Sequence, residues 1–441
     1  NSPEEEDIAK VLLDNGANVM ARDETGQTLI YAAIKKKNAS FIKLLLGYKN
    51  IDINQINFIS ETPLIFALKE ECGMDIIEEL LKANANPNVM NLLEQTPLSI
   101  ALSKYKEEEI VKLLIRYKVD MNTPAVSDIM PYTIKFTPLT ILCARKDVTL
   151  DKIKYFVENG ANVNVEPNIY GTPLQILCQK DMDNEEAICY LLEKGADCML
   201  GKEKGPIHKM IEKNNIILLK NMLKYGAEID TNEDETPYTT AIKKDRVECL
   251  KILMEHKVTL AYNPIRLTVE LDRINCLKVF LYYCKKHNYI KNLGIISMLA
   301  AFYNRYNILK LLLEYKAPIN YLNSYGELPL HTACRYKNHD MMRLLLPITV
   351  AVNSYEDNMK TPLHLAIENR DDIAVNMLLE DKRVDRYKVG TLFQLTPIQY
   401  AMSFSSQIFY KLLMQLPEQI NRVDKETQKT LLHFTLTDFG K

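Results

Sequence analysis

Apolar residues recur along the chain in two alternating blocks. The first block, as in ETPLIFA, QTPLSIA and KTPLHLA, places a threonine before apolar residues at helical spacing. The second block, as in DIIEELLKANANPN and YNILKLLLEYKAPIN, again has apolar residues at helical spacing and runs on into a turn segment. Each pair of blocks predicts two short helices, and the fold class is therefore predicted to be all-α.

The first block returns at a nearly constant interval. Its anchor, the threonine or the residue in its place, recurs after 31 to 41 residues, except for a longer gap between Thr236 and Leu328. Two weaker units anchored near Asn263 and Ile295 fill that gap. A unit of about 33 residues cannot bury its own apolar face, so we expect about thirteen units to stack in a solenoid. The anchors are Thr28, Thr62, Thr96, Thr137, Thr172, Gly205, Thr236, Leu328, Thr361, Thr396 and Thr430.

The positions within a unit have different structural roles. We expect the anchor threonine to cap the first helix and the proline after it to occupy the first helical position, where its missing N–H costs nothing. The leucine after the proline and the alanine five residues after the threonine are expected to face inward. Glycine is expected to end the second helix in the left-handed conformation, as at Gly16, Gly160, Gly195 and Gly226.

This unit resembles the ankyrin repeat family, whose signature is T-P-L-H-x-A within a period of about 33 residues. The resemblance covers essentially the whole chain, although the histidine is kept only at His208, His331, His364 and His433, and the unit near Asn263 keeps almost none of the signature. It implies an ankyrin-repeat solenoid of stacked antiparallel helix pairs with β-hairpin-like fingers and a concave groove.

Irregular units divide the chain. We expect an N-terminal array of about seven or eight repeats over residues 1–258, a degenerate repeat that forms a kink or seam over 259–294, and a C-terminal array of about four or five repeats over 295–441. The 41-residue interval carries an extended finger over 122–136, and LYYCKKHNYIKN stands where the degenerate repeat should have a finger. Both terminal repeats are partial, so we expect the parent protein to be longer.

Composition and motifs narrow the function. The apolar (47%) and charged (25%) fractions are those of a folded protein, and a net charge of −2 gives no overall attraction to nucleic acid. The longest apolar run, around 294–302, is far short of the roughly 20 residues of a membrane span. Nine cysteines at irregular spacing indicate reduced thiols in a cytoplasmic protein, and the spacing of Cys178, Cys189 and Cys198 suits no metal site. Since the sequence also lacks phosphate-binding glycine loops and metalloprotease or serine-hydrolase motifs, we expect no enzyme activity, no cofactor and no small-molecule substrate.

Basic residues and tyrosines gather at the ends of the first helices, at positions that the fold leaves free to face the groove. This basic stripe is expected to bind an acidic or phosphorylated segment, because Lys and Arg pair with carboxylate and phosphate and Tyr adds contact area. The alternative is that basic residues are favoured there by the helix dipole alone. The stripe consists of Lys35, Lys36, Lys37, Lys104, Tyr105, Lys106, Arg145, Lys146, Lys180, Lys243, Lys244, Tyr303, Arg305, Arg335, Tyr336 and Lys337.

Apolar residues also occupy finger tips, where charged residues are usual. Exposed contiguous apolar surface normally marks a contact with another molecule. The alternative is that each of these side chains packs on a neighbouring finger. The residues are Ile56, Phe58, Met90, Leu92, Tyr321, Leu322 and Tyr325.

The predicted function is that of a protein-binding scaffold or adaptor, which contacts its partner along the groove and the finger tips. A first alternative is that the chain is the recognition module of a larger protein, such as an E3 adaptor, a channel or a pathogen effector. A second alternative is a nucleic-acid-binding array that uses the basic stripe, but the net charge of −2 argues against it.

Overall fold

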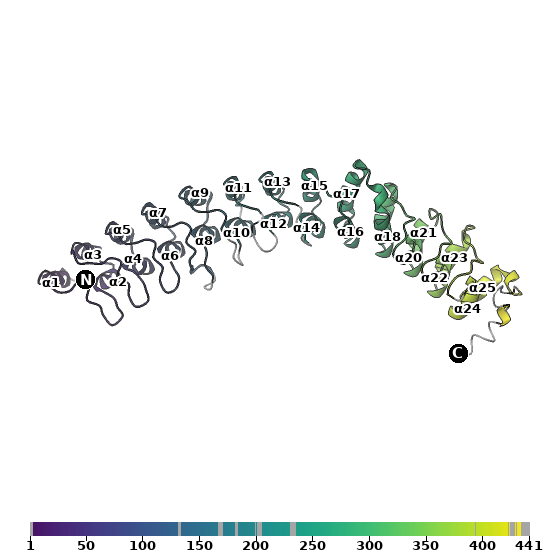
Figure 1. Cartoon of the computed structure of the whole chain (residues 1–441), viewed down its shortest axis with the longest axis horizontal. Coiled ribbons are helices and arrows are strands. Elements are labelled where there is room, and N and C mark those ends of the chain that lie inside the picture. Colours follow the sequence, from purple (N-terminus) through teal and green to yellow (C-terminus); the bar gives the residue numbers. More distant parts are fainter. Residues whose placement is uncertain are drawn as a thin grey trace. The chain divides into compact units, whose positions relative to one another are not determined.

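The structure is a computed structural model of the chain, drawn as a cartoon in Figure 1. Its contacts divide the chain into two compact units, Asn1–Glu228 (unit 1) and Ile229–Lys441 (unit 2). The division therefore lies before residue 258, where the sequence predicted the end of the N-terminal array. The residues that the structure describes are 3–130, 134–165, 171–180, 184–198, 200, 205–229, 235–392, 394–421, 423, 428 and 430–433.

Unit 1 is a row of helix pairs in which even-numbered first helices alternate with odd-numbered second helices. Each first helix packs on its own second helix and on the first helices of neighbouring repeats; α4, for example, packs against α2, α5 and α6. The fingers that precede α2 and α4 extend on the side of the first helices (Figure 1). The helices of unit 1 are α1 (Pro3–Asp14), α2 (Leu29–Lys35), α3 (Ala39–Leu46), α4 (Pro63–Lys69), α5 (Met74–Lys82), α6 (Pro97–Lys104), α7 (Glu109–Arg116), α8 (Pro138–Ala144), α9 (Leu150–Glu158), α10 (Pro173–Gln179), α11 (Glu185–Glu193), α12 (Pro206–Lys213) and α13 (Ile216–Lys224).

Unit 2 has the same alternation of first and second helices. Here α18 packs against α16 and α20, and α22 packs against α20, α23 and α24. The elements of unit 2 are α14 (Pro237–Lys243), α15 (Val247–His256), α16 (Tyr262–Glu270), α17 (Ile274–Lys286), η1 (Ile290–Leu293), α18 (Gly294–Phe302), α19 (Tyr306–Glu314), α20 (Pro329–Arg335), α21 (His339–Leu345), α22 (Pro362–Glu368), α23 (Asp372–Glu380), α24 (Pro397–Phe404), α25 (Ser406–Gln415) and η2 (Pro417–Gln419).

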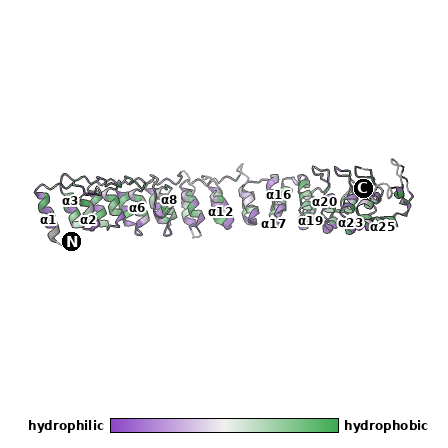
Figure 2. Ribbon diagram, turned by 90° about the horizontal axis from the view of Figure 1, so that it is seen from below, coloured by the Kyte–Doolittle hydropathy of each residue, from purple (hydrophilic) through white to green (hydrophobic). Residues whose placement is uncertain are grey.

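The inward positions of the repeat form the core of each unit. Leu64 and Ala67 are fully buried in α4, and Leu363 and Ala366 are fully buried at the same positions of α22. Alanine is short enough to let neighbouring first helices approach closely. The helices carry hydrophobic residues on this inward side and hydrophilic residues elsewhere, so both colours appear along each row of helices in Figure 2. The predicted inward face is confirmed.

The predicted threonine cap forms at five of the first helices, those that begin after Thr62, Thr96, Thr172, Thr236 and Thr361. The Oγ1 atom of Thr62, for example, accepts a hydrogen bond from the N–H of Ile65 (3.3 Å), whereas Thr28, Thr137 and Thr396 make no such bond. The residue three positions after the anchor adds a second bond by accepting from the backbone N–H of the anchor. Side chains of four different types fill this role, at Ser99, Gln175, Thr239, His331 and Gln399.

Left-handed residues end many of the second helices, although not α3, α15, α21 or α23. Where the repeat lacks the glycine, Asn84 (φ 64°), Lys118 (φ 58°) and Lys316 (φ 60°) adopt this conformation, at a cost of about 1 kcal/mol each. The missing finger glycines therefore change the stability of these turns but not their course. The predicted glycines Gly16, Gly160, Gly195 and Gly226 have φ values of +91°, +95°, +84° and +87°.

The fingers are tight turns, and none of the described residues forms a β-strand. In the finger before α4, the N–H of Asn57 donates to the carbonyl oxygen of Glu61 (3.0 Å), and Asn57 Oδ1 accepts from the N–H of Glu61 (2.9 Å). The extended finger is closed instead by an isolated antiparallel bridge between Ala125 and Phe136, and its residues 131–133 lie outside the described part of the chain.

Two successive connections in unit 2 are too short to form a finger. Residues 257–261 alone join α15 to α16, and 287–289 alone join α17 to η1. The segment LYYCKKHNYIKN is therefore mostly helical, at the end of α17 and in η1. Tyr321 from the following finger lies over Gly294, where an added Cβ would be only 2.9 Å from the Cβ of Tyr321. Glycine at the start of α18 is thus required for this close approach.

Candidate protein-binding surface

Several side chains of the basic stripe are engaged within the chain, at the ends of the first helices. The guanidinium of Arg145 donates to the carbonyl oxygens of Leu102 (2.5 Å) and Tyr105 (2.9 Å) after α6, and Lys180 Nζ donates to the carbonyl oxygen of Arg145 (2.5 Å). The last carbonyls of a helix have no partner within it, so each of these side chains caps the first helix of the preceding repeat. These capping residues are Arg145, Lys180 and Lys213 in unit 1, and Arg273, Arg305 and Asn369 in unit 2. Tyr105 donates instead to the carbonyl oxygen of Cys72 (3.1 Å), in the turn after α4.

The surroundings of the capping residues are polar and partly buried. Asp147 accepts from Arg145 (2.8 Å) and from Lys152 (3.0 Å), and these hydrogen bonds lower the pKa of its carboxyl. Burial lowers the pKa of Lys180. For these residues the structure therefore supports the alternative given in the sequence analysis, that the helix end favours basic side chains. Each side chain forms a hydrogen bond to the end of the first helix in the previous repeat.

A second group of stripe residues is paired with carboxylates of the fingers. Lys243 Nζ lies 2.6 Å from Glu235, and Arg335 lies 2.7 Å from Glu327 and 3.4 Å from Glu356. Glu235 and Glu327 directly precede the anchor, and their partners end the same first helix. These pairs offset the positive charge of the stripe, above all in unit 2. The same arrangement joins Lys69 to Glu61 and, with reversed charges, Glu368 to Lys360.

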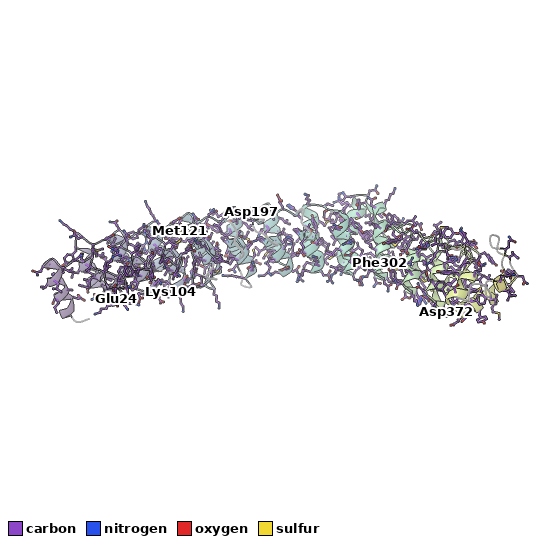
Figure 3. All side chains as sticks on the ribbon, turned by 60° about the horizontal axis from the view of Figure 1, so that its bottom comes forward. Glu24, Lys104, Met121, Asp197, Phe302 and Asp372 are labelled. Atoms are coloured by element: carbon purple, nitrogen blue, oxygen red, sulfur yellow. The ribbon has the colours of Figure 1, made fainter. Side chains whose placement is uncertain are left out.

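The remaining lysines of the stripe are exposed. Lys37 donates to the carbonyl oxygen of Glu71 (3.1 Å), and Lys104 lies 3.7 Å from the Glu71 carboxylate. Lys104 and Glu24 lie on one edge of unit 1 and Met121 on the opposite edge (Figure 3). Exposed lysines that form no ion pair within the described part of the chain are Lys35, Lys106 and Lys146 in unit 1, and Lys244 and Lys337 in unit 2.

Two tyrosines of the stripe, Tyr303 and Tyr336, belong to an aromatic group in unit 2. Tyr303 and Tyr336 lie around Phe302, which is labelled in Figure 3 and which the sequence analysis did not single out. Phe302 ends α18 as Arg335 ends α20. A comparison of the last residues of all first helices would therefore have found it.

The predicted apolar finger tips are exposed. Phe58 and Leu92 are each 65% exposed, and Tyr325 is 66% exposed. Sequence reasoning missed Ile59 and Leu93, which adjoin the first two and are also exposed. The backbone connects these tips, because the N–H of Leu92 donates to the carbonyl oxygen of Ile59 (3.4 Å). The remaining predicted tip residues, Ile56, Met90, Tyr321 and Leu322, are exposed as well.

Phe58 also packs on a neighbouring finger. A Cβ added at Gly26 would lie 2.6 Å from Phe58 Cδ1, and Gly26 has a φ of +77°. The N–H of Phe58 donates to the carbonyl oxygen of Thr25 (3.2 Å) in the same finger as Gly26. Phe58 therefore fits both explanations of the apolar finger tips. Part of its ring packs on the neighbouring finger, and the rest is exposed and could contact a partner.

A row of asparagines joins successive fingers and was not foreseen. Asn88 Nδ2 donates to the carbonyl oxygen of Lys118 (3.3 Å), while Asn88 Oδ1 accepts from the N–H of Asp120 (2.6 Å). The same pair of bonds is made by Asn54, Asn122, Asn164 and Asn353. The sequence does contain a signal for these residues. Each of the asparagines stands eight residues before the anchor of its repeat, or fifteen residues before it where the finger is extended.

Two of the repeat histidines, His331 and His364, connect neighbouring repeats. His331 Nε2 lies 2.9 Å from the carbonyl oxygen of Ser354, and His364 Nε2 lies 3.1 Å from that of Leu395. Burial lowers the pKa of both rings, to about 4 for His364. A neutral imidazole can accept from the anchor through Nδ1, from the N–H of Leu328 at His331 and from the hydroxyl of Thr361 at His364, and can donate to the next finger through Nε2.

Eight of the nine cysteines are buried, and Cys189 is partly exposed. All nine are free thiols, and burial raises the pKa of Cys178 and Cys198 to about 12. Within the described residues, no three His, Cys, Asp or Glu side chains converge in a way that could hold a metal ion. None of the described helices has the length and hydrophobicity that a membrane crossing requires.

A family model supports the repeat structure. The family model for ankyrin repeats (3 copies) matches residues 2–91, 71–166, 98–202, 181–264 and 297–389. No curated protein matches the chain. The crystal structure of the human ASB11 ankyrin repeat domain is similar at 18% sequence identity and a TM-score of 0.36, over 48% of this chain and 90% of that one. Because the family matches cover most of the sequence, the chain belongs to the ankyrin repeat family.

Proposed function

We propose that this ankyrin repeat protein is a non-catalytic, cytoplasmic scaffold or adaptor, and that unit 1 binds an acidic or phosphorylated segment of its partner. Ankyrin repeats are generally protein-protein interaction modules. The observation that carries the proposal is the set of exposed lysines at the first-helix ends of unit 1, Lys35, Lys106 and Lys146, which form no ion pair among the described residues. Arg145 and Lys180 of the same stripe bind helix-end carbonyls, whereas these three lysines remain available to bind a partner.

The apolar finger tips of unit 1 support the same proposal. Phe58 and Leu92 expose most of their side chains on adjacent fingers. A partner that places acidic groups at the lysines and apolar groups at these tips would bury both kinds of surface. Lysine pairing then sets the orientation and the apolar contact adds most of the affinity.

A charge-matched triple variant tests the lysines. Lys35, Lys106 and Lys146 are replaced by Ser, and binding is measured to a peptide that alternates Glu and phosphoserine and carries one Trp as reporter. The chain contains no Trp, so peptide fluorescence has no background. We expect the affinity at 150 mM salt to fall at least fivefold, with unchanged helicity.

The control triple replaces Lys10, Lys43 and Lys220, which are exposed on second helices. It removes the same charge and should bind the peptide like wild type. An equal loss of affinity in both triple variants would show that only the net charge matters. Unchanged affinity in both would reject the three lysines as a binding site.

A further inference from the structure

Three exposed aromatic rings meet at the first-helix ends of unit 2. The ring centroids of Phe302 and Tyr303 are 5.1 Å apart at 87°, and those of Phe302 and Tyr336 are 5.5 Å apart at 88°. Their exposed fractions are 48%, 36% and 50%, respectively. Both contacts are edge-to-face, a favourable geometry for aromatic pairs. We refer to these three residues as the aromatic patch.

The aromatic patch is held by the neighbouring repeats. The hydroxyl of Tyr303 donates to Glu270 Oε1 (3.0 Å) at the end of α16, and Tyr336 from the α20 repeat packs on Phe302 of α18. Leu271, which is exposed, stands directly after α16 as Tyr303 stands after α18 and Tyr336 after α20. Leu271, Tyr303 and Tyr336 thus form a row with one apolar side chain per repeat.

Charges around the aromatic patch cancel in pairs. Arg266 lies 3.2 Å from Glu270, and Arg305 lies 3.6 Å from Asp272. Arg335, next to Tyr336, is paired with its finger carboxylates as described above. Of the basic residues next to the patch, only Lys337 has no ion pair in the described part of the chain. An acidic segment would find little unpaired positive charge here, so the patch favours a neutral, apolar occupant.

We infer that the aromatic patch binds a proline-rich segment of a partner protein in the polyproline II conformation. This conformation has three residues per turn and a rise of 3.1 Å, so residues three apart are about 9.3 Å apart along its axis. Packed helices are 8–10 Å apart, so successive repeats present their row residues at about the same spacing. Prolines at positions i, i+3 and i+6 would therefore face Leu271, Tyr303 and Tyr336 in turn.

The chemistry of the segment matches that of the patch. Aromatic surfaces are the usual docking sites for proline rings, and a polyproline II segment loses little conformational entropy on binding. Its backbone carbonyls have no internal hydrogen bonds, so they remain available to donors such as the hydroxyl of Tyr336. The inference rests on the proposed protein-binding function, but it concerns a different surface. The aromatic patch lies in unit 2, whereas the lysines of the proposed function lie in unit 1.

A library of random 12-residue peptides displayed on phage tests the inference, with the full chain as bait. The baits are wild type, a Phe302→Ser/Tyr336→Ser variant, and a Tyr410→Ser control that alters an exposed tyrosine on α25. We expect wild type and control to enrich peptides with proline at i and i+3, and the double variant not to. A synthetic copy of the most enriched peptide, tagged with Trp, should bind the double variant at least tenfold more weakly. Melting curves of all three proteins verify that they are folded.

Other outcomes would overturn the inference. Enrichment of leucines seven residues apart would indicate a helical occupant, and enrichment of acidic peptides would indicate an extension of the basic stripe. Equal enrichment of proline on the double variant would place the site elsewhere. Binding of the Glu-phosphoserine peptide to the same preparations tests the proposed function separately, since that peptide depends on the lysines of unit 1.

Discussion

Unit 1 and unit 2 are built from the same repeat but differ in what they leave at the surface. Both units expose apolar finger tips, but unit 1 leaves three stripe lysines without an ion pair in the described part of the chain, whereas in unit 2 most stripe cations are bound to carboxylates or carbonyls and a group of aromatic rings is exposed. The fingers differ as well, because two successive connections of unit 2 have none. The inward positions and the hydrogen bonds between repeats are nevertheless alike. Stacking therefore constrains the buried residues of each repeat and leaves its exposed ones free to specialise.

The largest expected effect tests whether the two units are separate in stability. Leu64→Asp in unit 1 and Leu363→Asp in unit 2 each bury an unpaired carboxylate at the same repeat position and should cost roughly 3–5 kcal/mol. In an array stabilised by nearest neighbours, each variant should lose hydrogen-exchange protection mainly in its own unit. Leu363→Met is the conservative control. Equal loss of protection in both units from either variant would contradict the division.

Acid should weaken unit 2 through its buried histidines. The pKa of His364 is about 4 because burial disfavours the charged ring, whereas an unfolded histidine has a pKa of about 6.5. Between these values only the unfolded state binds the proton, so stability is lost as the pH falls from about 6.5 to about 4, by about 3 kcal/mol over the full range. Urea unfolding of unit 2, followed by hydrogen exchange at several pH values, measures this loss.

A conservative variant isolates the histidine. His364→Gln should reduce the pH dependence of unit 2 while keeping the fold, because Gln399 accepts the anchor N–H from the same position in the next repeat. An unchanged pH dependence in this variant would mean that other groups cause the acid effect.

The asparagine row should matter more in unit 1, where it joins successive fingers. Asn88→Ala removes two hydrogen bonds to the next finger and should cost about 1–2 kcal/mol. Its effect should reach the neighbouring fingers, which Asn54 and Asn122 connect in the same way. Asn353→Ala in unit 2 should act only locally, and Asn18→Ala, which removes only a bond to Met20, is the control. Hydrogen exchange measures how far each effect extends. If Asn88→Ala changed exchange rates only in its own finger, as expected for Asn353→Ala, the proposed difference between the two units would be wrong.

The smallest effect separates capping from binding in unit 1. Arg145→Ala should lower stability by about 1 kcal/mol, because it leaves the last carbonyls of α6 without their cap. Lys146→Ala should leave the melting temperature unchanged and weaken only the binding of the acidic peptide. The Arg145–Asp147 pair holds the Asp147 pKa low, so its stabilisation is present above about pH 4 and is lost below it. A destabilised Lys146→Ala variant would show that this lysine has a structural role.

The repeat architecture could be predicted from the sequence because its signals are local. A threonine before a proline fixes a helix start, and a glycine after paired leucines fixes a helix end, as at Thr62 and Gly195. Positions such as Leu363 are buried in one repeat after another, as at Leu64, Leu98 and Leu330, so their chemistry recurs and the period is visible. The candidate surface was predicted less well, because Phe302 and Ile59 occupy exposed positions, where the fold does not constrain the residue type.

Only the tertiary structure decided which exposed residues are available to a partner. The sequence alone determined the helix pairs, their order and their inward faces, because each depends on residues within one repeat. Arg145 and Lys146 are adjacent and both basic, yet the first binds carbonyls some forty residues earlier and the second faces solvent. Which of the two is free depends on where the preceding helix ends in space. That relation is set by the packing of one repeat on another, and nothing in the local sequence encodes it.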